Sequence, residues 1–158
     1  MLRSFKFENL FLSFFGAGYA PFAPGTFGTL ATMPIIVAIV KFQIPIYFLI
    51  PFYISTFVFS VFIINVVQKK QKILDPSWIV IDEVLGVLVA TPFIKNDSWW
   101  HFLLIFILFR IFDITKLPPI NLVDKKMKNG FGVILDDVIA GAYTVISYEI
   151  IILVLTKI

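Results

Sequence analysis

The hydropathy pattern of the chain predicts five apolar helices separated by shorter polar segments. A bilayer has a hydrocarbon layer of about 30 Å, which about 20 apolar helical residues cross, so these segments are typical of membrane-spanning or core helices. The predicted helices cover residues 27–42, 44–67, 78–93, 99–116 and 131–156. Ahead of them, residues 4–15 predict an amphipathic helix lying at the membrane surface, with Phe5, Leu12 and Phe15 on its apolar side.

Polar connections complete the predicted layout. Residues 16–29 are rich in Gly and Pro and are predicted to be non-helical until Thr26, which is expected to cap the first long helix. Residues 43–45 are expected to form a turn, and residues 68–77 and 117–130 to form polar loops. The pattern therefore predicts an all-α membrane bundle made of a single domain, residues 1–158.

The distribution of basic residues predicts an orientation. Cytoplasmic loops of membrane proteins carry an excess of Lys and Arg. With a cytoplasmic N-terminus, the inner side holds Arg3, Lys6, Lys69, Lys70, Lys72, Lys116, Lys125, Lys126 and Lys128. The outer side then holds only Lys41, Lys95 and Lys157. We also expect Trp78 at the inner interface, and Trp99, Trp100 and His101 at the outer one.

Composition supports the membrane setting and excludes several chemistries. Hydrophobic residues make up 59% of the chain and the mean hydropathy is +0.97, whereas soluble domains are roughly 45–50% apolar. The chain has no Cys and one His, which excludes cysteine phosphatases and mechanisms that need two histidines. The net charge of +3 comes without a dense basic face, so nucleic-acid binding is not expected.

Acidic residues within the apolar segments are the main functional signal, because buried charge is costly and rarely without a role. Asp82 and Glu83 lie about one turn inside the third predicted helix, Asp113 and Lys116 end the fourth, and Asp136 and Asp137 begin the fifth. On the predicted topology these groups reach the same cytoplasmic depth, together with Gly25 and Thr26. Glu149 lies toward the far end and is assigned no role.

A short internal similarity relates two of these segments. The segment Ile81-Asp82-Glu83-Val84-Leu85-Gly86 aligns with Leu135-Asp136-Asp137-Val138-Ile139-Ala140. Gly86 lies four residues after Asp82 and Gly141 four residues after Asp137, and small residues let membrane helices approach closely. The two carboxylate pairs are therefore predicted to face each other, although a match of this length also arises by chance.

Converging carboxylates without His or Cys favour a hard cation, Mg²⁺ or Mn²⁺. Arg110, Asp113 and Lys116 follow one stripe of the fourth helix and form either a self-neutralising salt-bridge ladder or a phosphate clamp in which Asp113 assists the metal. The corner Gly25-Thr26-Phe27-Gly28-Thr29 is predicted to offer free backbone N–H groups to an anion.

These features favour metal-assisted attack of water, or of an enzyme carboxylate, on a phosphoester at the membrane surface. The alternatives are an ion-coupled transporter or channel subunit, a structural membrane protein with neutralised ion pairs, and a phosphatase of another lipid phosphate. Ion sites of transporters usually lie near the bilayer midplane, whereas these acids gather at one end.

Four segments of the chain together resemble the phosphatidylglycerophosphatase A family of bacterial membrane phosphatases. The segments are GAGYAPFAPGTFGT (16–29), WIVIDEVLG (78–86), FRIFDITKLPPI (109–120) and GFGVILDDVIAG (130–141). One departure is Leu117, where the family pattern K-P-x-P-I has a proline.

The resemblance implies Mg²⁺-dependent hydrolysis of phosphatidylglycerophosphate at the cytoplasmic face of a bacterial inner membrane, and a bundle with one central helix. It implies that metal is held by Asp82, Glu83, Asp136 and Asp137, with Asp113 close by, and that these residues and Lys116 form the catalytic group. Phosphate would be held by Arg110, Lys116, Gly25, Thr26, Gly28 and Thr29. The implied partners are the lipid substrate and the bilayer, and no protein partner is inferred.

Overall fold

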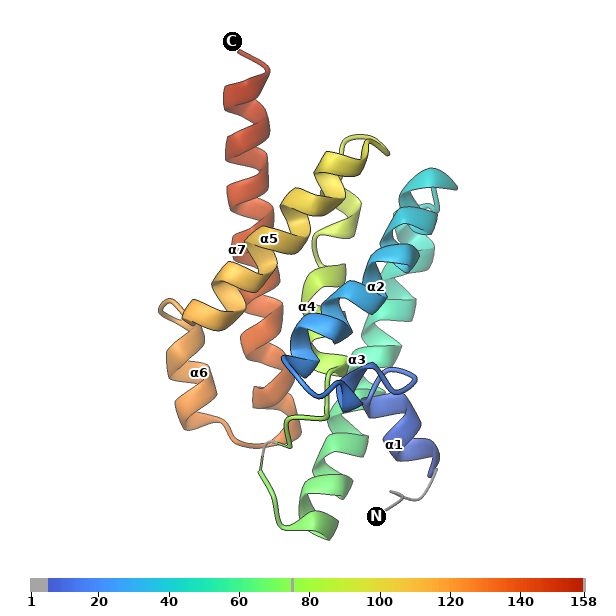
Figure 1. Cartoon of the computed structure of the whole chain (residues 1–158), viewed down its shortest axis with the longest axis vertical. Coiled ribbons are helices and arrows are strands. Elements are labelled where there is room, and N and C mark those ends of the chain that lie inside the picture. The colour runs from blue at the N-terminus through green and yellow to red at the C-terminus, as the bar shows by residue number, and fades with distance from the viewer. Residues whose placement is uncertain (1–5, 75, 158) are drawn as a thin grey trace.

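The computed structural model describes residues 6–74 and 76–157, and within these ranges the chain forms helices and no strands (Figure 1). The α-helices are α1 (Phe7–Leu12), α2 (Pro24–Lys41), α3 (Ile46–Gln71), α4 (Ile81–Leu88), α5 (Trp99–Thr115), α6 (Ile120–Lys126) and α7 (Gly130–Leu155). Two short 3₁₀ helices are η1 (Ala17–Tyr19) and η2 (Thr91–Phe93). The predicted all-α class is confirmed.

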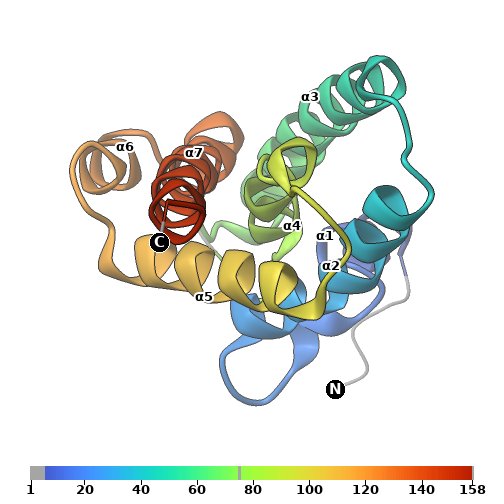
Figure 2. The same cartoon turned by 90° about the horizontal axis from the view of Figure 1, so that it is seen from above.

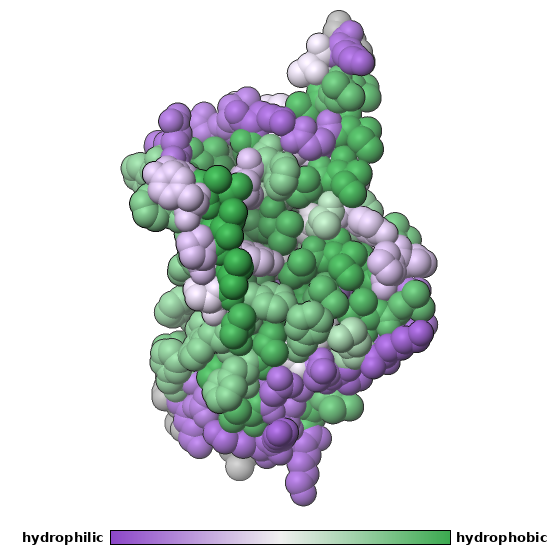
Figure 3. Space-filling model, turned by 180° about the vertical axis from the view of Figure 1, so that it is seen from behind, coloured by the Kyte–Doolittle hydropathy of each residue, from purple (hydrophilic) through white to green (hydrophobic). Residues whose placement is uncertain are grey.

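Within the part of the chain that the structure describes, three helices, α2, α3 and α7, are long and apolar enough to cross a membrane. In α3 only 11% of the most apolar 18-residue stretch is buried inside the protein. Its side chains therefore face outward, as those of a lipid-exposed helix do. The hydrophilic surface gathers at two opposite ends of the molecule, with a mainly hydrophobic surface between them (Figure 3). These features are those of a membrane protein.

The predicted continuous helix over residues 78–93 is wrong. Its central part is α4, which has 8 residues and spans about 12 Å, too short to cross a bilayer. Most of α4 is buried, and it packs against α2, α3, α5 and α7. Seen from above, it lies inside the ring of longer helices (Figure 2). The segment is apolar because it is the central core helix of the bundle.

Two glycines set the close crossing of α4 and α7. A Cβ atom added to Gly86 would lie 2.7 Å from the carbonyl oxygen of Asp137, and one added to Gly141 would overlap the carbonyl oxygen of Gly86. The backbones can approach this closely only because neither position carries a side chain. The crossing places the start of α4 beside Asp137, as the internal similarity predicted.

Several helix ends differ from the prediction. Helix α2 begins at Pro24 and is preceded by Ala23, so Thr26 is not its cap. Proline suits the first turn of a helix because its missing N–H would have no partner there. The segment 117–130, predicted as a loop, contains α6.

The predicted N-terminal surface helix ends earlier than expected and is not purely a surface element. Among the described residues of this segment, 6–15, the α-helix covers Phe7–Leu12, and Leu12 is fully buried in the core. Phe15 is exposed, and Phe5 lies outside the described residues. The main-chain carbonyl of Leu12 accepts a hydrogen bond of 2.9 Å from Val80 N–H, which ties α1 to the segment leading into α4.

The predicted separation of the lysines is present in the fold. The start of α1, which follows Lys6, the end of α3 with Lys69 and Lys70, and the end of α6 lie toward one end of the molecule (Figure 1). The turns at residues 42–45 and 94–98 and the C-terminus lie toward the other end. We refer to the first as the basic end. Arg3 lies outside the described residues.

Two predicted interfacial side chains are buried. His101 is 2% exposed, and its Nδ1 lies 2.7 Å from the Tyr148 hydroxyl. Trp78 is 4% exposed and stacks on Tyr19. Trp99, by contrast, is largely exposed. An aromatic residue beside a predicted helix end can therefore belong to the core instead of the membrane interface.

The crossing of α4 and α7 predicts an asymmetric effect of two neighbouring substitutions. Gly141→Val should lower stability by about 1–3 kcal/mol, because the new side chain forces the two backbones apart. Ala142→Val adds methyl groups at an exposed position one residue along α7 and serves as the control. The midpoint of thermal unfolding in detergent should fall for the first variant only, and equal midpoints would contradict the close crossing.

The orientation expected from the lysine distribution predicts on which side of the membrane the C-terminus lies. A compartment-sensitive reporter fused after Lys157 should read as outside the cytoplasm, because the end of α7 lies opposite the basic end (Figure 1). A reporter inserted in the turn at residues 42–45 should read the same way. A cytoplasmic signal from either fusion would reverse the assigned orientation.

Candidate active site

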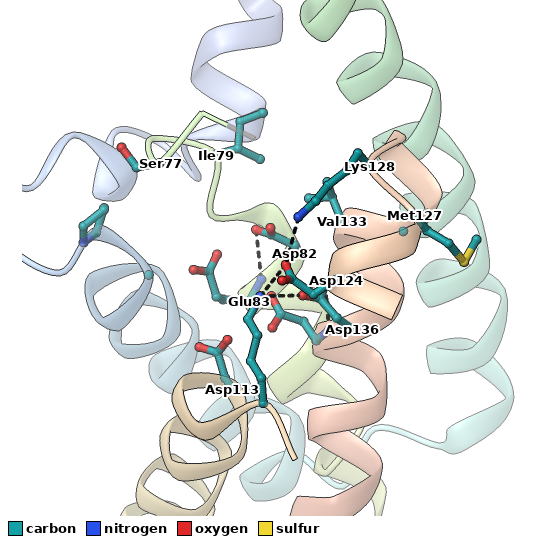
Figure 4. A pocket seen from close by; sticks show the side chains of 15 residues that line it. Ser77, Ile79, Asp82, Glu83, Asp113, Asp124, Met127, Lys128, Val133 and Asp136 are labelled. Carbon is teal, nitrogen blue, oxygen red and sulfur yellow. Dashed lines mark hydrogen bonds and ion pairs between the residues drawn. The ribbon is translucent and has the colours of Figure 1, made fainter. Parts of the chain in front are cut away.

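A cavity of about 200 Å³ lies where α2, α4, α5, α6 and α7 meet (Figure 4). It is lined by Pro24, Gly25, Ser77, Ile79, Asp82, Glu83, Asp113, Lys116, Asp124, Met127, Lys128, Gly132, Val133, Asp136 and Asp137. All six residues that were predicted to form the catalytic group line this single cavity. Sequence positions more than fifty residues apart therefore converge, as the common depth of their charges predicted.

Three of the carboxylates form a compact cluster. Asp82, Glu83 and Asp137 each offer an oxygen, and these atoms lie within 4.8 Å of one another. Asp82 and Asp137 are buried, and Glu83 Oε2 is buried without a hydrogen-bond partner among the described residues. Asp113 adds like-charge repulsion to both Glu83 and Asp137. Buried carboxylates at this range need a cation or protons between them, and an all-oxygen donor set suits Mg²⁺.

Asp136 makes different contacts from its neighbour. Its Oδ2 accepts a hydrogen bond of 2.9 Å from Lys116 Nζ, and its Oδ1 accepts one of 3.2 Å from the Asp137 N–H. Asp82 likewise accepts a bond of 3.1 Å from the Glu83 N–H. In both acidic pairs the first side chain therefore holds the backbone of the second. The metal-ligand roles of Asp82, Glu83, Asp136 and Asp137 all stay predictions, and Asp136 lies outside the compact three-residue cluster.

Lys116 lies between two carboxylates. It follows α5 in the left-handed backbone conformation (φ 45°) with which many helices end. Its Nζ is 2.7 Å from Asp124 Oδ1 and 2.9 Å from Asp136 Oδ2. Partial burial works against the charge, but these hydrogen bonds outweigh it, so the pKa of Lys116 is raised. The hydrogen bond from Lys116 in turn lowers the pKa of Asp124.

Arg110 lies behind the cavity and does not line it. Its Nη1 donates a hydrogen bond of 2.5 Å to Asp113 Oδ2 and lies 3.5 Å from Thr29 Oγ1. The predicted ladder along the fourth helix is thus formed in part, since Arg110 pairs with Asp113 while Lys116 turns to other acids. Arg110 ties α5 to α2 and fixes the carboxylate of Asp113.

The Gly-Thr corner serves helix packing more than predicted. The N–H groups of Thr26 and Phe27 both donate to the Ala23 carbonyl, so they are not free for an anion and that part of the prediction is wrong. Gly28 packs against the Val80 side chain, and Thr29 Oγ1 donates to the Gly25 carbonyl at 2.9 Å. Of the corner, only Gly25 lines the cavity, where an added Cβ would overlap the Glu83 carboxylate.

Sequence reasoning missed Asp124 and Lys128. Lys128 Nζ lies 3.5 Å from Asp124 Oδ1, and both residues line the cavity (Figure 4). One signal was available, because Asp124 is the only acidic residue in the basic stretch of residues 117–130. That signal did not say which lysine Asp124 would meet.

The fold and the cavity define a class, a membrane-embedded helical protein with a carboxylate-rich site at its basic end. The family model of phosphatidylglycerophosphatase A matches residues 10–152. The chain belongs to this family, and it is a phosphatase. No solved structure matches the chain.

Curated relatives agree with the family assignment. A phosphatidylglycerophosphatase A of Haemophilus influenzae is 38% identical over 132 residues, covering 84% of this chain and 80% of the relative. The Escherichia coli protein of the same name is 29% identical over 127 residues, covering 80% and 73%. A Bacteroides thetaiotaomicron relative, provisionally named as a phosphatidylinositol-3-phosphatase, is 39% identical over 145 residues, covering 84% and 85%.

The contact between Gly25 and Glu83 predicts a specific defect. Gly25→Ala should displace the Glu83 carboxylate and weaken divalent-cation binding by about tenfold, as loss of one ligand contact does. The control is Gly28→Ala, which crowds Val80 instead of a carboxylate. Titration of thermal stability with Mg²⁺ measures both. If Gly25→Ala left the Mg²⁺ concentration for half-maximal stabilisation unchanged, the result would contradict a role of Glu83 in the proposed cation site.

Proposed function

We propose that the protein hydrolyses phosphatidylglycerophosphate to phosphatidylglycerol and inorganic phosphate, with Mg²⁺, in phospholipid biosynthesis at the bacterial cytoplasmic membrane. The observation that carries the proposal is the cluster of Asp82, Glu83 and Asp137 in a cavity that Lys116 also lines, in a chain of this family. The cavity at the basic end would face the cytoplasm, where a lipid headgroup presents its phosphate.

The cavity divides into a cation side and a phosphate side. Asp82, Glu83 and Asp137 would hold Mg²⁺, with Asp136 as the further predicted ligand. When bound, Mg²⁺ would neutralise phosphoryl charge and polarise the phosphorus–oxygen bonds. Lys116 would donate to a phosphoryl oxygen, since a charged donor makes strong hydrogen bonds to phosphate.

Asp113 is the carboxylate that we assign to proton transfer. It lines the cavity outside the three-residue cluster, and the hydrogen bond from Arg110 holds its Oδ2. An oriented carboxylate within reach of the phosphate can accept a proton from attacking water. In this arrangement Arg110 acts on the reaction through Asp113, and a direct contact of Arg110 with phosphate stays a prediction.

A second candidate substrate comes from the relatives. The Bacteroides protein carries the name of a phosphatase acting on a phosphoinositide, at an identity similar to that of the Haemophilus protein. Both headgroups would present a phosphate monoester to the same carboxylates. Parallel assays of phosphatidylglycerophosphate and phosphatidylinositol 3-phosphate in mixed micelles would separate the two, with faster release expected from the first.

The cation site predicts the effect of two isosteric substitutions and of a chelator. Asp82→Asn and Asp137→Asn should each lower phosphate release by about a hundredfold or more while the helical circular dichroism is unchanged, because each removes a charged ligand. Excess EDTA should have the same effect on the unmodified protein.

The matched control is Asp97→Asn, an exposed acid in the turn at residues 94–98, which should retain full activity. Undiminished release in EDTA, or full activity of both cluster variants, would refute the metal site.

A further inference from the structure

The ammonium group of Lys116 is held by two carboxylates that belong to different helices. Its Nζ contacts Asp124 Oδ1 at 2.7 Å from α6 and Asp136 Oδ2 at 2.9 Å from α7. An ammonium group has three N–H donors. The two carboxylates take two of them, which leaves the third for a ligand in the cavity that Lys116 lines.

Both carboxylates that hold Lys116 come from helices that pack firmly on the rest of the bundle. Asp136 belongs to the first turns of α7, which packs on α4 and α5. Asp124 belongs to α6, which packs on α7 with Ile120 buried, and the Tyr143 hydroxyl donates a bond of 2.7 Å to the Pro118 carbonyl just before α6. A lysine side chain is flexible in isolation, so the contacts with Asp124 and Asp136 fix the position of the Lys116 ammonium group.

Stability alone accounts poorly for Asp124. The side chains of Asp124 and Lys116 are 26% and 33% exposed, and ion pairs with this much solvent contact contribute little to folding. Asp124 also faces Lys128, and both line the cavity. The arrangement places Asp124 where its contact acts on the orientation of Lys116.

We propose that Asp124 is a positioning residue that holds the Lys116 ammonium for the phosphate group of the substrate. The inference rests on the proposed function, in which Lys116 binds phosphate. Asp124 itself touches neither the reacting phosphorus nor the cation cluster, and it acts through Lys116.

The first test compares Asp124→Asn with Asp124→Glu and with the control Glu149→Gln. Glu149 forms an ion pair of 2.7 Å with Lys95 at the opposite end of the molecule. It is a matched control because it is also a partly exposed carboxylate paired with a lysine. In Asp124→Asn we expect KM and the inhibitory concentration of inorganic phosphate both to rise about tenfold, with kcat within about threefold, the size of a lost charged hydrogen bond. Asp124→Glu should recover most of the loss, and Glu149→Gln should match the unmodified protein.

The second test is a double-mutant cycle that needs no turnover. Binding of inorganic phosphate in the presence of Mg²⁺ is measured as thermal stabilisation in the unmodified protein, Asp124→Asn, Lys116→Ala and the double variant. If Asp124 acts through Lys116, then Asp124→Asn has no further effect once Lys116 is removed. Additive losses would show that Asp124 acts separately and would overturn the proposal.

The outcomes also separate this inference from the proposed function. Absence of phosphate release by the unmodified protein would refute the function, whatever the variants do. Normal release with an Asp124→Asn variant of unchanged KM and phosphate inhibition would refute only the positioning role. A loss confined to kcat would also refute the positioning role, because a lysine that is held in place to bind phosphate must affect KM and phosphate inhibition.

Discussion

The contact on which the site depends most is the crossing of α4 and α7 at Gly86 and Gly141. Each glycine meets the backbone of the opposite helix, so the helices are closer than side chains would allow. Because of that approach, Asp82 and Glu83 at the start of α4 lie against Asp137 in α7. The remaining residues of α4 are apolar because most of this short helix is buried among α2, α3, α5 and α7. A mainly apolar helix with two acids at its start suits the proposed cation site in the core of a helical bundle.

The long lipid-facing elements were predictable because their hydropathy signal is strong over more than twenty residues. The predicted helices at residues 44–67 and 131–156 correspond closely to α3 and α7. The helix at residues 78–93 was mispredicted, because an apolar run does not distinguish a membrane span from a buried core helix. Helix α2 begins at Pro24, earlier than predicted, because a proline in the first turn starts the helix without a polar cap.

In the site too, one feature was predictable from the sequence and another was not. The position of charges along the chain predicted which residues meet, whereas helix packing decides which of them pair. Placing each acid at a helix end was enough to predict that Asp82, Glu83, Asp113, Asp136 and Asp137 would converge, and they line one cavity. Their pairing was not predictable. Lys116 turns away from Asp113 on its own helix because its left-handed backbone redirects it toward α6 and α7. Asp124 was missed because its position depends on α6, whose short helix carried too weak a pattern to be predicted.

The balance of charge in the cavity bears on the order of events under the proposed function. Six acidic and two basic residues line it, and Arg110 behind it is paired with Asp113. A phosphate monoester is itself anionic, so an empty cavity with these acids ionised would repel it. Lys116 does little to offset this, because two carboxylates already share its charge. A divalent cation among Asp82, Glu83 and Asp137 would cancel most of the negative charge of these three acids and would offer the phosphate oxygens direct coordination. The cation would therefore precede the lipid phosphate, and Lys116 would then contribute direction to a binding site whose attraction comes mainly from the metal.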